Sequence, residues 1–333
     1  MLQSVDGDAS RLRPHVKTHK MLPVVQMQLD AGITRFKVAT IAEAELCARA
    51  GSPDVLLAYQ PVGPNVRRLA ELVALYPETS FATIVDAAEV ADDISAHFEA
   101  EPLRTFVDID VGMQRTGIRP GSSAVALVDL INSLPGTEFA GIHAYDGHIH
   151  QPALLAREKA FHEASGMISD FVKLCDPPAV VAGGTPTFTM VAAHTPWQCS
   201  PGTALLWDLG YGEAFPDLGF EIAALLVTRV VSRADGGRLC LDLGYKAVAA
   251  EKPLERRVWF PALPSASFVV QNEEHLVITA ESADGIEVGI EFYAFPNHIC
   301  PTVALHAQAT LIRDGRATGE VWPILARDRV LSV

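Results

Sequence analysis

Cysteine is scarce in this sequence of 333 residues. The count is odd and no CxxC motif is present; the five residues are Cys47, Cys175, Cys199, Cys240 and Cys300. This pattern excludes the disulfide scaffold of a small secreted domain. It indicates free thiols in a reducing compartment and therefore predicts a cytoplasmic protein.

Long apolar runs are lacking as well. Runs such as residues 222–227 are typical of the longest, far below the roughly 18 residues of a membrane-spanning helix. The first eight residues, MLQSVDGD, contain no basic region followed by an apolar stretch. The sequence therefore predicts neither a membrane span nor a secretory signal.

Basic residues are few relative to acidic ones. Lys plus Arg number 26 and Asp plus Glu number 40, which gives a net charge of −14. A nucleic-acid-binding protein or one attracted to anionic lipid needs a basic face, so both classes are disfavoured. The 49% of hydrophobic residues provide for a large core and exclude wholesale disorder. We expect the partner to be a small-molecule substrate.

The first two thirds of the chain alternate short apolar runs with longer stretches of helical periodicity. This alternation is typical of parallel βαβ units. Helices are predicted over residues 41–50, 65–76, 87–97, 122–134 and 154–174, and a weaker one follows the seventh strand at 187–193, between prolines. Eight strands are predicted, which is the number in a (β/α)₈ barrel of the TIM type: residues 12–18, 35–39, 55–60, 81–85, 105–111, 139–145, 179–184 and 198–206.

The pattern of the sequence changes after Phe220. No convincing long helix follows, and turns rich in Gly and Asp separate short strand-like runs. Strands are predicted over residues 223–231, 238–242, 258–260, 274–280, 289–294, 302–312 and 319–325. The fold class predicted is thus α/β, with a barrel domain over residues 1–212 and a β-rich domain over 213–333.

The first predicted strand carries four basic side chains at alternate positions, in RPHVKTHK over residues 13–20. Side chains alternate in a strand, so Arg13, His15, Lys17 and His19 share one face. The outer helix layer is apolar, so we place this face at the carboxyl-terminal mouth of the barrel. A crowded, partly desolvated lysine there suits a Schiff-base nucleophile. A solvated basic strand end is the alternative.

Two further motifs contain groups that bind ligands. His298 and Cys300 in PNHICP point the same way in an extended backbone, and nitrogen with sulfur suits zinc. Two ligands would leave positions open for water or substrate, although an H-x-C pair also arises by chance. Gly183, Gly184 and Thr185 follow the seventh strand, where barrels often bind phosphate; an ordinary turn is the alternative.

Other polar residues follow the fifth, sixth and eighth predicted strands. Arg115, Tyr145 and His148 would lie at the same barrel mouth, where an Arg or Tyr suits the ring of an aromatic cofactor. Tyr211 lies in DLGYG, a second candidate for the phosphate loop, for which a simple turn also accounts. Taken singly, each of these side chains also suits an ordinary surface or core position.

Together these motifs resemble the pyridoxal-phosphate enzymes of the D-threonine aldolase and D-serine dehydratase family, which have the alanine-racemase-type fold. The resemblance covers essentially the whole chain. It implies that Lys17 is the Schiff-base lysine, that Gly183, Gly184 and Thr185 hold the phosphate, and that His298 and Cys300 bind a divalent metal. It further assigns Arg115 and Tyr145 to the cofactor ring. With these we group His15 and Tyr211 as cofactor-binding candidates, and His148 with Lys17 as a catalytic candidate.

The resemblance implies a lyase that acts on D-3-hydroxy amino acids. Retro-aldol cleavage to glycine and an aldehyde, and elimination to a keto acid and ammonia, both remain open. Cysteine as a metal ligand favours zinc over manganese or magnesium and resembles the dehydratase side of the family. A metal-independent racemase is the alternative. A homodimer is also implied, with the β-rich domain of one subunit docked at the barrel mouth of the other.

One departure from the family pattern concerns the amino terminus. Only twelve residues precede Arg13, whereas the family has a strand and a helix ahead of the lysine motif. We expect this difference to affect stability more than chemistry.

Overall fold

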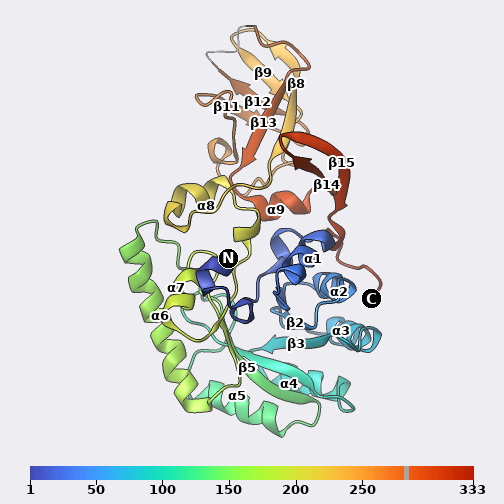
Figure 1. Ribbon diagram of the computed structural model, residues 1–333, viewed down its shortest axis with the longest axis vertical. Helices are drawn as coiled ribbons and strands as arrows, with labels where there is room; N and C mark the ends of the chain where they lie inside the picture. Colours follow the sequence, from blue (N-terminus) through green and yellow to red (C-terminus); the bar gives the residue numbers. More distant parts are fainter. Residues whose placement is uncertain (281–284) are drawn as a thin grey trace. The chain divides into compact units, whose positions relative to one another are not determined.

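The computed structural model describes residues 1–280 and 285–333, which form two compact units (Figure 1). Unit 1 consists of residues 1–202 together with 328–333, and unit 2 spans residues 203–327. The compact units thus divide at residue 202/203, where the sequence suggested a boundary at 212/213. Among the helices of the described residues, none has the length and apolar content needed to cross a bilayer.

A parallel sheet is the centre of unit 1. Its strands follow one another in chain order, each hydrogen-bonded to the next. The strands are β1 (Arg35–Val38), β2 (Asp54–Leu57), β3 (Ser80–Val85), β4 (Leu103–Asp108), β5 (Thr137–Ala144), β6 (Val180–Ala182) and β7 (Gln198–Cys199). Sequential parallel order is the arrangement of a barrel, which confirms the predicted fold class.

Helices connect these strands and cover the outer side of the sheet (Figure 1). Their bounds agree closely with the periodicity of the sequence: α2 (Ile41–Arg49), α3 (Pro64–Leu75), α4 (Ala88–His97), α5 (Ser122–Ser133), α6 (Leu154–Cys175) and α7 (Phe188–His194). Local signals define several ends. Thr40, for example, accepts a hydrogen bond from the N–H of Glu43 and so caps α2. The sequence reading missed α1 (Leu22–Asp30), which has proline in its first turn.

The barrel is closed by residues 12–15, which were predicted as part of its first strand. This prediction was wrong in detail: Leu12 forms an isolated parallel bridge to Cys199 of β7, and His15 forms one to Lys37 of β1. Pro14 has no N–H to donate and the chain turns into the 3₁₀ helix η3 (Val16–Thr18), so no ladder develops. The segment nevertheless occupies the eighth position around the barrel.

The inner side of the sheet is layered. Paired residues on parallel strands face the same side, so the register identifies this side directly. An apolar middle layer consists of Leu56, Ala82, Ile84, Phe106, Ala140 and Val181. Lys37 pairs with Leu56, and Asp108 pairs with His143, which pairs with Val181. Lys37, Asp108 and His143 therefore face inward, at or near the carboxyl ends of their strands.

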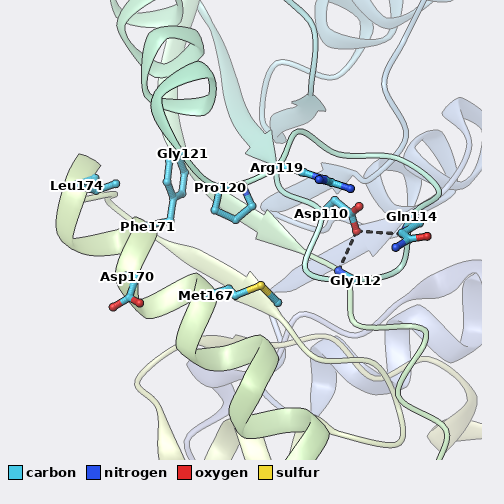
Figure 2. Close-up of a pocket in the computed structure, with 10 residues that line it drawn as sticks. All are labelled: Asp110, Gly112, Gln114, Arg119, Pro120, Gly121, Met167, Asp170, Phe171 and Leu174. Carbon is cyan, nitrogen blue, oxygen red and sulfur yellow. Dashed lines mark hydrogen bonds between the residues drawn. The ribbon is translucent and has the colours of Figure 1, made fainter.

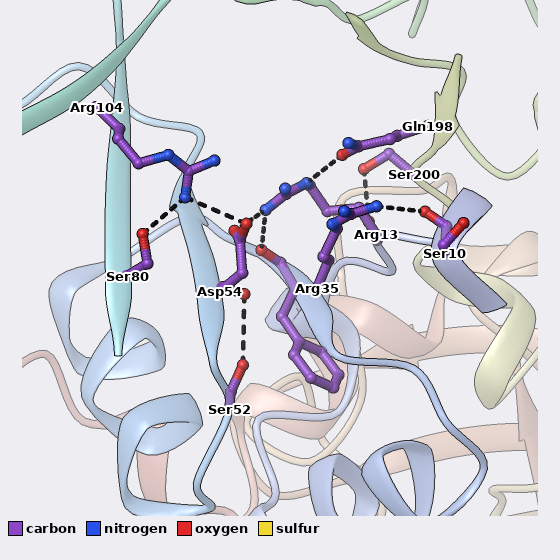
Figure 3. Close-up of polar contacts among 10 residues, drawn as sticks. Ser10, Arg13, Arg35, Ser52, Asp54, Ser80, Arg104, Gln198 and Ser200 are labelled. Carbon is purple, nitrogen blue, oxygen red and sulfur yellow. Dashed lines mark hydrogen bonds and ion pairs between the residues drawn. The ribbon is translucent and has the colours of Figure 1, made fainter. Parts of the chain in front are cut away.

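The amino-terminal end of the barrel interior is also polar (Figure 3). Arg13 is fully buried and its Nη1 lies 2.6 Å from Oδ1 of Asp54, the first residue of β2. Arg104 pairs with the other oxygen of Asp54 at 3.2 Å, and Gln198 accepts from Nε of Arg13 at 2.7 Å. This network joins the beginnings of β2, β4 and β7 to the closing segment.

Unit 2 contains a mainly antiparallel sheet and a separate hairpin. The sheet order is β10 (Val258–Trp259), β13 (Glu291–Pro296), β8 (Leu226–Ala234), β9 (Arg238–Leu241), β12 (Leu276–Thr279) and β11 (Ser267–Gln271). β14 (Gln308–Arg313) and β15 (Arg316–Pro323) form the hairpin. The core of the sheet is apolar, and includes Leu241, Leu276 and Ile278. The β-rich character of this part is confirmed.

Two details of unit 2 differ from the sequence reading. β11 was not predicted. The predicted strand over residues 302–312 begins too early, because residues 299–304 form helix α9 (Ile299–Ala304) and the strand starts only at Gln308. Thr302 donates its hydroxyl to the carbonyl of His298, one turn back, which supports the helix locally. Part of the predicted strand over 274–280 is β12.

Candidate active site

Lys17 lies in η3, immediately after the segment that closes the barrel. His15 caps this short helix: its Nδ1 accepts from the backbone N–H of Lys17 at 3.2 Å. The His15 ring is buried, whereas Lys17 is only partly buried. The helix turn therefore leaves the lysine side chain at the surface of the interior, where a ligand can reach it.

The ring of Tyr145 brings three cationic side chains together. Lys17 Nζ lies 5.7 Å from the ring centroid, Lys37 Nζ 5.6 Å and Arg115 Cζ 5.2 Å. These are cation–π distances, and the negative face of the ring partly offsets the repulsion among the cations. The structure thus groups Lys17, Tyr145 and Arg115, which were all predicted, and adds Lys37, which was not.

Lys37 is connected to an acidic residue through a histidine. Its Nζ lies 3.5 Å from Nε2 of His143, and Nδ1 of His143 lies 2.6 Å from Oδ1 of Asp108. Asp108 therefore holds the proton on Nδ1, and Nε2 is left to accept from Lys37. The sequence analysis did not select His143 as a site residue.

Burial and crowding keep most of these basic groups neutral. Burial, followed by the charges of Lys17 and Lys37, lowers the pKa of His15 well below its usual value. Burial lowers the pKa of His19 to about 3. Burial, together with the nearby Lys17, lowers the pKa of Lys37 to about 7, although Asp146 and Asp108 oppose this. Both histidines are thus neutral near pH 7 and able to accept hydrogen bonds.

The glycine-rich loop after β6 is fixed by Asp146. Its Oδ1 accepts from the N–H of Gly184 at 2.8 Å, and its Oδ2 accepts from the hydroxyl of Thr187 at 2.5 Å. Thr185 Oγ1 accepts from the N–H of Gly202 at 3.1 Å, which joins this loop to the one after β7. Gly183 has a φ of +73°, a conformation that favours glycine.

Two glycines permit the close approach of Tyr145 to this loop. A Cβ on Gly147 would lie 2.2 Å from the Tyr145 ring, so no other residue fits there without a shift. A Cβ on Gly184 would lie 3.2 Å from the same ring. The predicted phosphate loop and the predicted ring residue are therefore neighbours in the structure.

The shared-face prediction for the first motif was only partly right. Arg13 and His15 do face inward, but Arg13 lies at the amino-terminal end, paired with Asp54, and not at the mouth (Figure 3). His19 is buried beyond η3, with Nδ1 accepting from the N–H of Met21. The alternation fails because a helical turn replaces extended backbone after His15.

His148 is exposed and its ring lies against the backbone of Gly112, where an added Cβ would approach Nε2 to 2.8 Å. Next to it, on the outer side, is a cavity of about 510 Å³ between the 110–121 loop and α6 (Figure 2). In the loop, Asp110 accepts from the N–H groups of Gly112 and Gln114. None of the predicted site residues lines this cavity, so we do not place the site there.

His298 and Cys300 both belong to unit 2, and Cys300 is among the groups that act on the His298 ring. The expected extended backbone is wrong: His298 is the extended residue that precedes α9, and Cys300 lies in its first turn. Nδ1 of His298 lies 2.5 Å from Oε1 of Glu251, and Cys300 Sγ lies 3.4 Å from Oγ1 of Thr203. Burial opposes the charged form of His298, but Cys300 and Glu251 raise its pKa overall.

The donor set of this pair fits a metal ion in part. Imidazole nitrogen and thiolate sulfur are ligands that zinc prefers. A carboxylate on the second ring nitrogen, as Glu251 provides here, is the usual orienting group of a metal-bound histidine. In the part of the chain that the structure describes, no third His, Cys, Asp or Glu side chain joins them.

Tyr211, the remaining predicted residue, lies in α8 (Leu209–Ala214) of unit 2. Its ring packs between Trp207 and Phe215 at centroid distances of 5.5 and 5.4 Å. Asp208, which is fully buried, accepts from the N–H of Tyr211 and from that of Ile299, so it caps both α8 and α9. The carboxylate thereby ties the segment of Tyr211 to that of His298.

The sequence reading missed Lys37, Asp146 and Glu251 as site residues. A signal for Lys37 existed: it is the charged residue between Phe36 and Val38 in a short apolar strand, so alternation directs it to the inside. Asp146 and Glu251 are identified only by their contacts with Gly184 and His298, which lie 38 and 47 positions further along the chain. No local sequence pattern shows such contacts.

The residues of unit 1 also fit the implied cofactor. A planar aldehyde with a phosphate group needs an amine, an aromatic or cationic contact for its ring, and a glycine-rich turn for its phosphate. Lys17, Tyr145, Arg115 and the loop at Gly183 supply these, and the glycines let the Tyr145 ring approach the loop closely.

Comparison with known proteins identifies the same family. The model of the alanine racemase N-terminal domain matches residues 1–209, and that of a putative serine dehydratase domain matches residues 223–312. D-threonine aldolase from Arthrobacter sp is 29% identical over 333 residues, covering 95% of this chain and 85% of that protein. D-threo-3-hydroxyaspartate dehydratase from Delftia sp. (strain HT23) is 26% identical, covering 95% and 90%.

Solved structures agree with this. D-threonine aldolase from Filomicrobium marinum superposes with a TM-score of 0.87 at 25% identity, over 98% of this chain and 92% of that one. Alanine racemase from Bacillus anthracis, at 18% identity, has a TM-score of 0.70 over 98% and 96%, and so shares the fold. The relatives named as aldolases and dehydratases are pyridoxal-phosphate-dependent lyases, and alanine racemase is a more distant relation.

The resemblance inferred from the sequence motifs is therefore confirmed. Since the first domain model covers well over half of the chain, this protein belongs to the pyridoxal-phosphate-dependent family defined by the alanine racemase N-terminal domain, with a domain of the serine dehydratase type following it.

Proposed function

We propose that the protein is a pyridoxal-phosphate- and divalent-metal-dependent lyase that acts on D-3-hydroxy amino acids. The observation that carries the proposal is the grouping of Lys17, Arg115 and Tyr145 beside the glycine-rich loop. It is supported by relatives whose names describe D-threonine aldolase and 3-hydroxy-D-aspartate aldolase.

Within unit 1 each residue has a separate task. Lys17 would hold the cofactor through its aldehyde, while Tyr145 and Arg115 would contact its ring. Gly183, Gly184 and Thr185 would hold the phosphate, with Asp146 fixing their loop. When bound, the cofactor supplies an electron sink for the carbanion that forms at the substrate α-carbon.

Elimination requires a base that removes the α-proton, whereas cleavage requires an acid that returns a proton to the α-carbon. Lys17, once displaced by the substrate amine, is able to take a proton at Nζ, and it lies over the Tyr145 ring. His15 is neutral and caps the Lys17 turn, so it fixes the position of the lysine and adds no charge. His148, which is exposed, is the second catalytic candidate.

In unit 2, His298 and Cys300 would hold the metal ion, zinc by the chemistry of the donors, with manganese or magnesium as alternatives. Glu251 would orient the His298 ring. A metal ion held there supplies a Lewis acid for the substrate hydroxyl. Lowering the pKa of that hydroxyl favours carbon–carbon cleavage, and assisting its departure favours elimination.

The test is turnover of D-threonine and D-serine by the purified protein, before and after chelation. We expect a visible absorbance band from the bound cofactor, metal in the protein, and loss of turnover on chelation with recovery on addition of Zn²⁺. Glycine plus an aldehyde identifies an aldolase, and a keto acid plus ammonia identifies a dehydratase.

Two outcomes would contradict parts of this proposal. A protein without a visible band would exclude the cofactor. A protein with the band but no metal, whose rates are unaffected by chelator, would leave His298 and Cys300 as structural residues and favour the racemase alternative.

We also infer a homodimer, because closed two-fold dimers are the commonest assemblies and the family resemblance implies a shared site. Light scattering should give twice the mass of the 35.8 kDa chain, and a fully active monomer would contradict the inference. A cytoplasmic location stays a prediction from the odd cysteine count.

A further inference from the structure

Unit 1 contains a second lysine at the site that the proposed mechanism does not use. Lys37 is only 3% exposed, and it lies on β1 with its side chain directed to the inside of the barrel. Its Nζ lies at almost the same distance from the Tyr145 ring as that of Lys17, 5.6 Å against 5.7 Å. Burying an amine in this position is unfavourable unless something compensates it.

The protein groups around Lys37 compensate it incompletely. From β5 and the turn after it come His143, Tyr145 and Asp146, and from β4 comes Asp108. From the closing segment and η3 come Arg13, His15 and Lys17. The nearest acceptor is the neutral Nε2 of His143, at 3.5 Å, which is the long end of a hydrogen bond.

We propose that Lys37 binds the ionised hydroxyl oxygen attached to the ring of pyridoxal phosphate (the ring oxygen) and is held toward it by His143 and Asp108. The inference rests on the proposed function, because it requires the cofactor to be joined to Lys17. The ring oxygen of pyridoxal is on the carbon next to the one that bears the aldehyde. An amine that shares the Tyr145 ring with Lys17 therefore has this anion as its natural partner.

The hydrogen-bond chain explains how the ammonium is aimed. Asp108 fixes the proton of His143 on Nδ1, so Nε2 is an acceptor directed to Lys37. Among the residues that the structure describes, the same chain gives Lys37 one hydrogen-bond acceptor, and its remaining N–H groups are left for the ligand. In the absence of the anion, burial beside Lys17 lowers the pKa of Lys37 to about 7, so the cofactor would restore the charge.

The experiment is a pH titration of the visible absorption of the holoenzyme, which follows the proton on the nitrogen joined to the cofactor. A cation at Lys37 disfavours that proton. For Lys37→Met we therefore expect the midpoint to rise by about one pH unit or more, since removing a charge from a partly buried site beside the cofactor has an effect of this size. Lys37→Arg should stay close to the wild-type midpoint.

A matched control is Lys173→Met, which removes an exposed lysine on α6 that pairs with Asp170. It should leave the midpoint unchanged. A Lys37→Met midpoint within about 0.2 units of wild type, or one equal to that of Lys37→Arg, would overturn the inference. A wild-type protein that shows no band would instead contradict the proposed function.

A second measurement needs no variant. In protein labelled with ¹³C at the lysine Cε, one lysine signal should titrate near pH 7 without cofactor. After loading, it should persist and titrate at least about one unit higher, because its partner is then an anion. A signal whose midpoint stays the same or falls on loading would show that Lys37 does not face the ring oxygen.

Discussion

Crowding of positive side chains at one tyrosine has consequences for every residue near it. Lys17, Lys37 and Arg115 all lie within 6 Å of the Tyr145 ring. Burial, followed by the charges of Lys17 and Lys37, lowers the pKa of His15 beside them, so this histidine is neutral. Bringing in a ligand with several negative charges relieves this repulsion, which is why the cluster suits a phosphorylated, anionic cofactor better than a neutral one.

Lys17 should be the lysine that holds the cofactor. Reduction of the holoenzyme with borohydride, followed by peptide mapping, should place the label on Lys17, because it is the less buried of the two site lysines and lies in a short helix turn. Lys17→Ala should lower turnover by about 10³-fold or more, the scale of losing a covalent group.

A label on any other lysine would contradict this assignment. A label on Lys37 would exchange the roles of the two lysines, and a label on Lys20 or Lys246 would contradict the assignment altogether. Lys246 serves as the control, since its side chain is about half exposed and pairs with Glu273 in unit 2.

At the scale of elements, the sequence predicted most of unit 1 because its signals are local. Helix periodicity and caps such as Thr40 gave α2 to α6, and apolar runs gave β1 to β5. The closing segment could not be predicted in the same way. Alternation was extended through Pro14 into η3, although a proline and a helix turn interrupt it.

The same distinction between local and long-range signals applies to the candidate site residues. Motifs whose residues are adjacent in sequence, such as Gly183 to Thr185 and His298 with Cys300, were found as candidates. The link from Asp108 to His143 joins neighbouring strands, and Asp146 reaches a loop far along the chain. Such pairs depend on strand register, which is a tertiary property, so the sequence alone did not indicate them.

The polar network at the amino-terminal end of the barrel interior gives a prediction at this scale. Asp54 is paired with Arg13 and Arg104; burial opposes ionisation, but the two arginines outweigh it and lower the pKa of Asp54. A lowered folded-state pKa means stability that is present above the unfolded pKa, near 4, and is lost as pH falls through the folded value. Asp54→Asn should cost about 3–5 kcal/mol at pH 7, because Arg13 is left buried without its carboxylate.

Thermal unfolding at pH 7 and at pH 3 checks this. The variant should unfold at a lower temperature at pH 7, and the difference from wild type should shrink in acid. Asp170→Asn is the matched control, since that exposed pair with Lys173 should contribute less than about 1 kcal/mol. A difference that is constant with pH would show that Asp54 does not contribute through its charge.

At the scale of the whole molecule, the residues proposed for the cofactor and those proposed for the metal ion belong to different units. Lys17, Tyr145 and the glycine-rich loop belong to unit 1, and His298, Cys300 and Glu251 belong to unit 2. Alanine racemase from Desulforamulus reducens matches this chain in sequence over 38% of its length, whereas the aldolase and dehydratase relatives match over 95%. Since the proposed cofactor residues and the proposed metal ligands lie in different units, the two proposals are open to separate tests.

Cys300→Ala provides that separation. It removes the sulfur ligand, so the metal content should fall and turnover of D-threonine and D-serine should drop by about 100-fold or more, beyond what loss of an orienting residue usually costs. The visible cofactor band should remain, because Lys17 and the phosphate loop are in unit 1. The matched control is Cys240→Ala, which changes a partly buried cysteine on β9 of the same unit and should alter neither metal content nor turnover.

A Cys300→Ala protein that keeps its metal and its turnover would show that the His-x-Cys pair binds no catalytic ion. Loss of the visible band in that variant would show that the two units are not independent in cofactor binding.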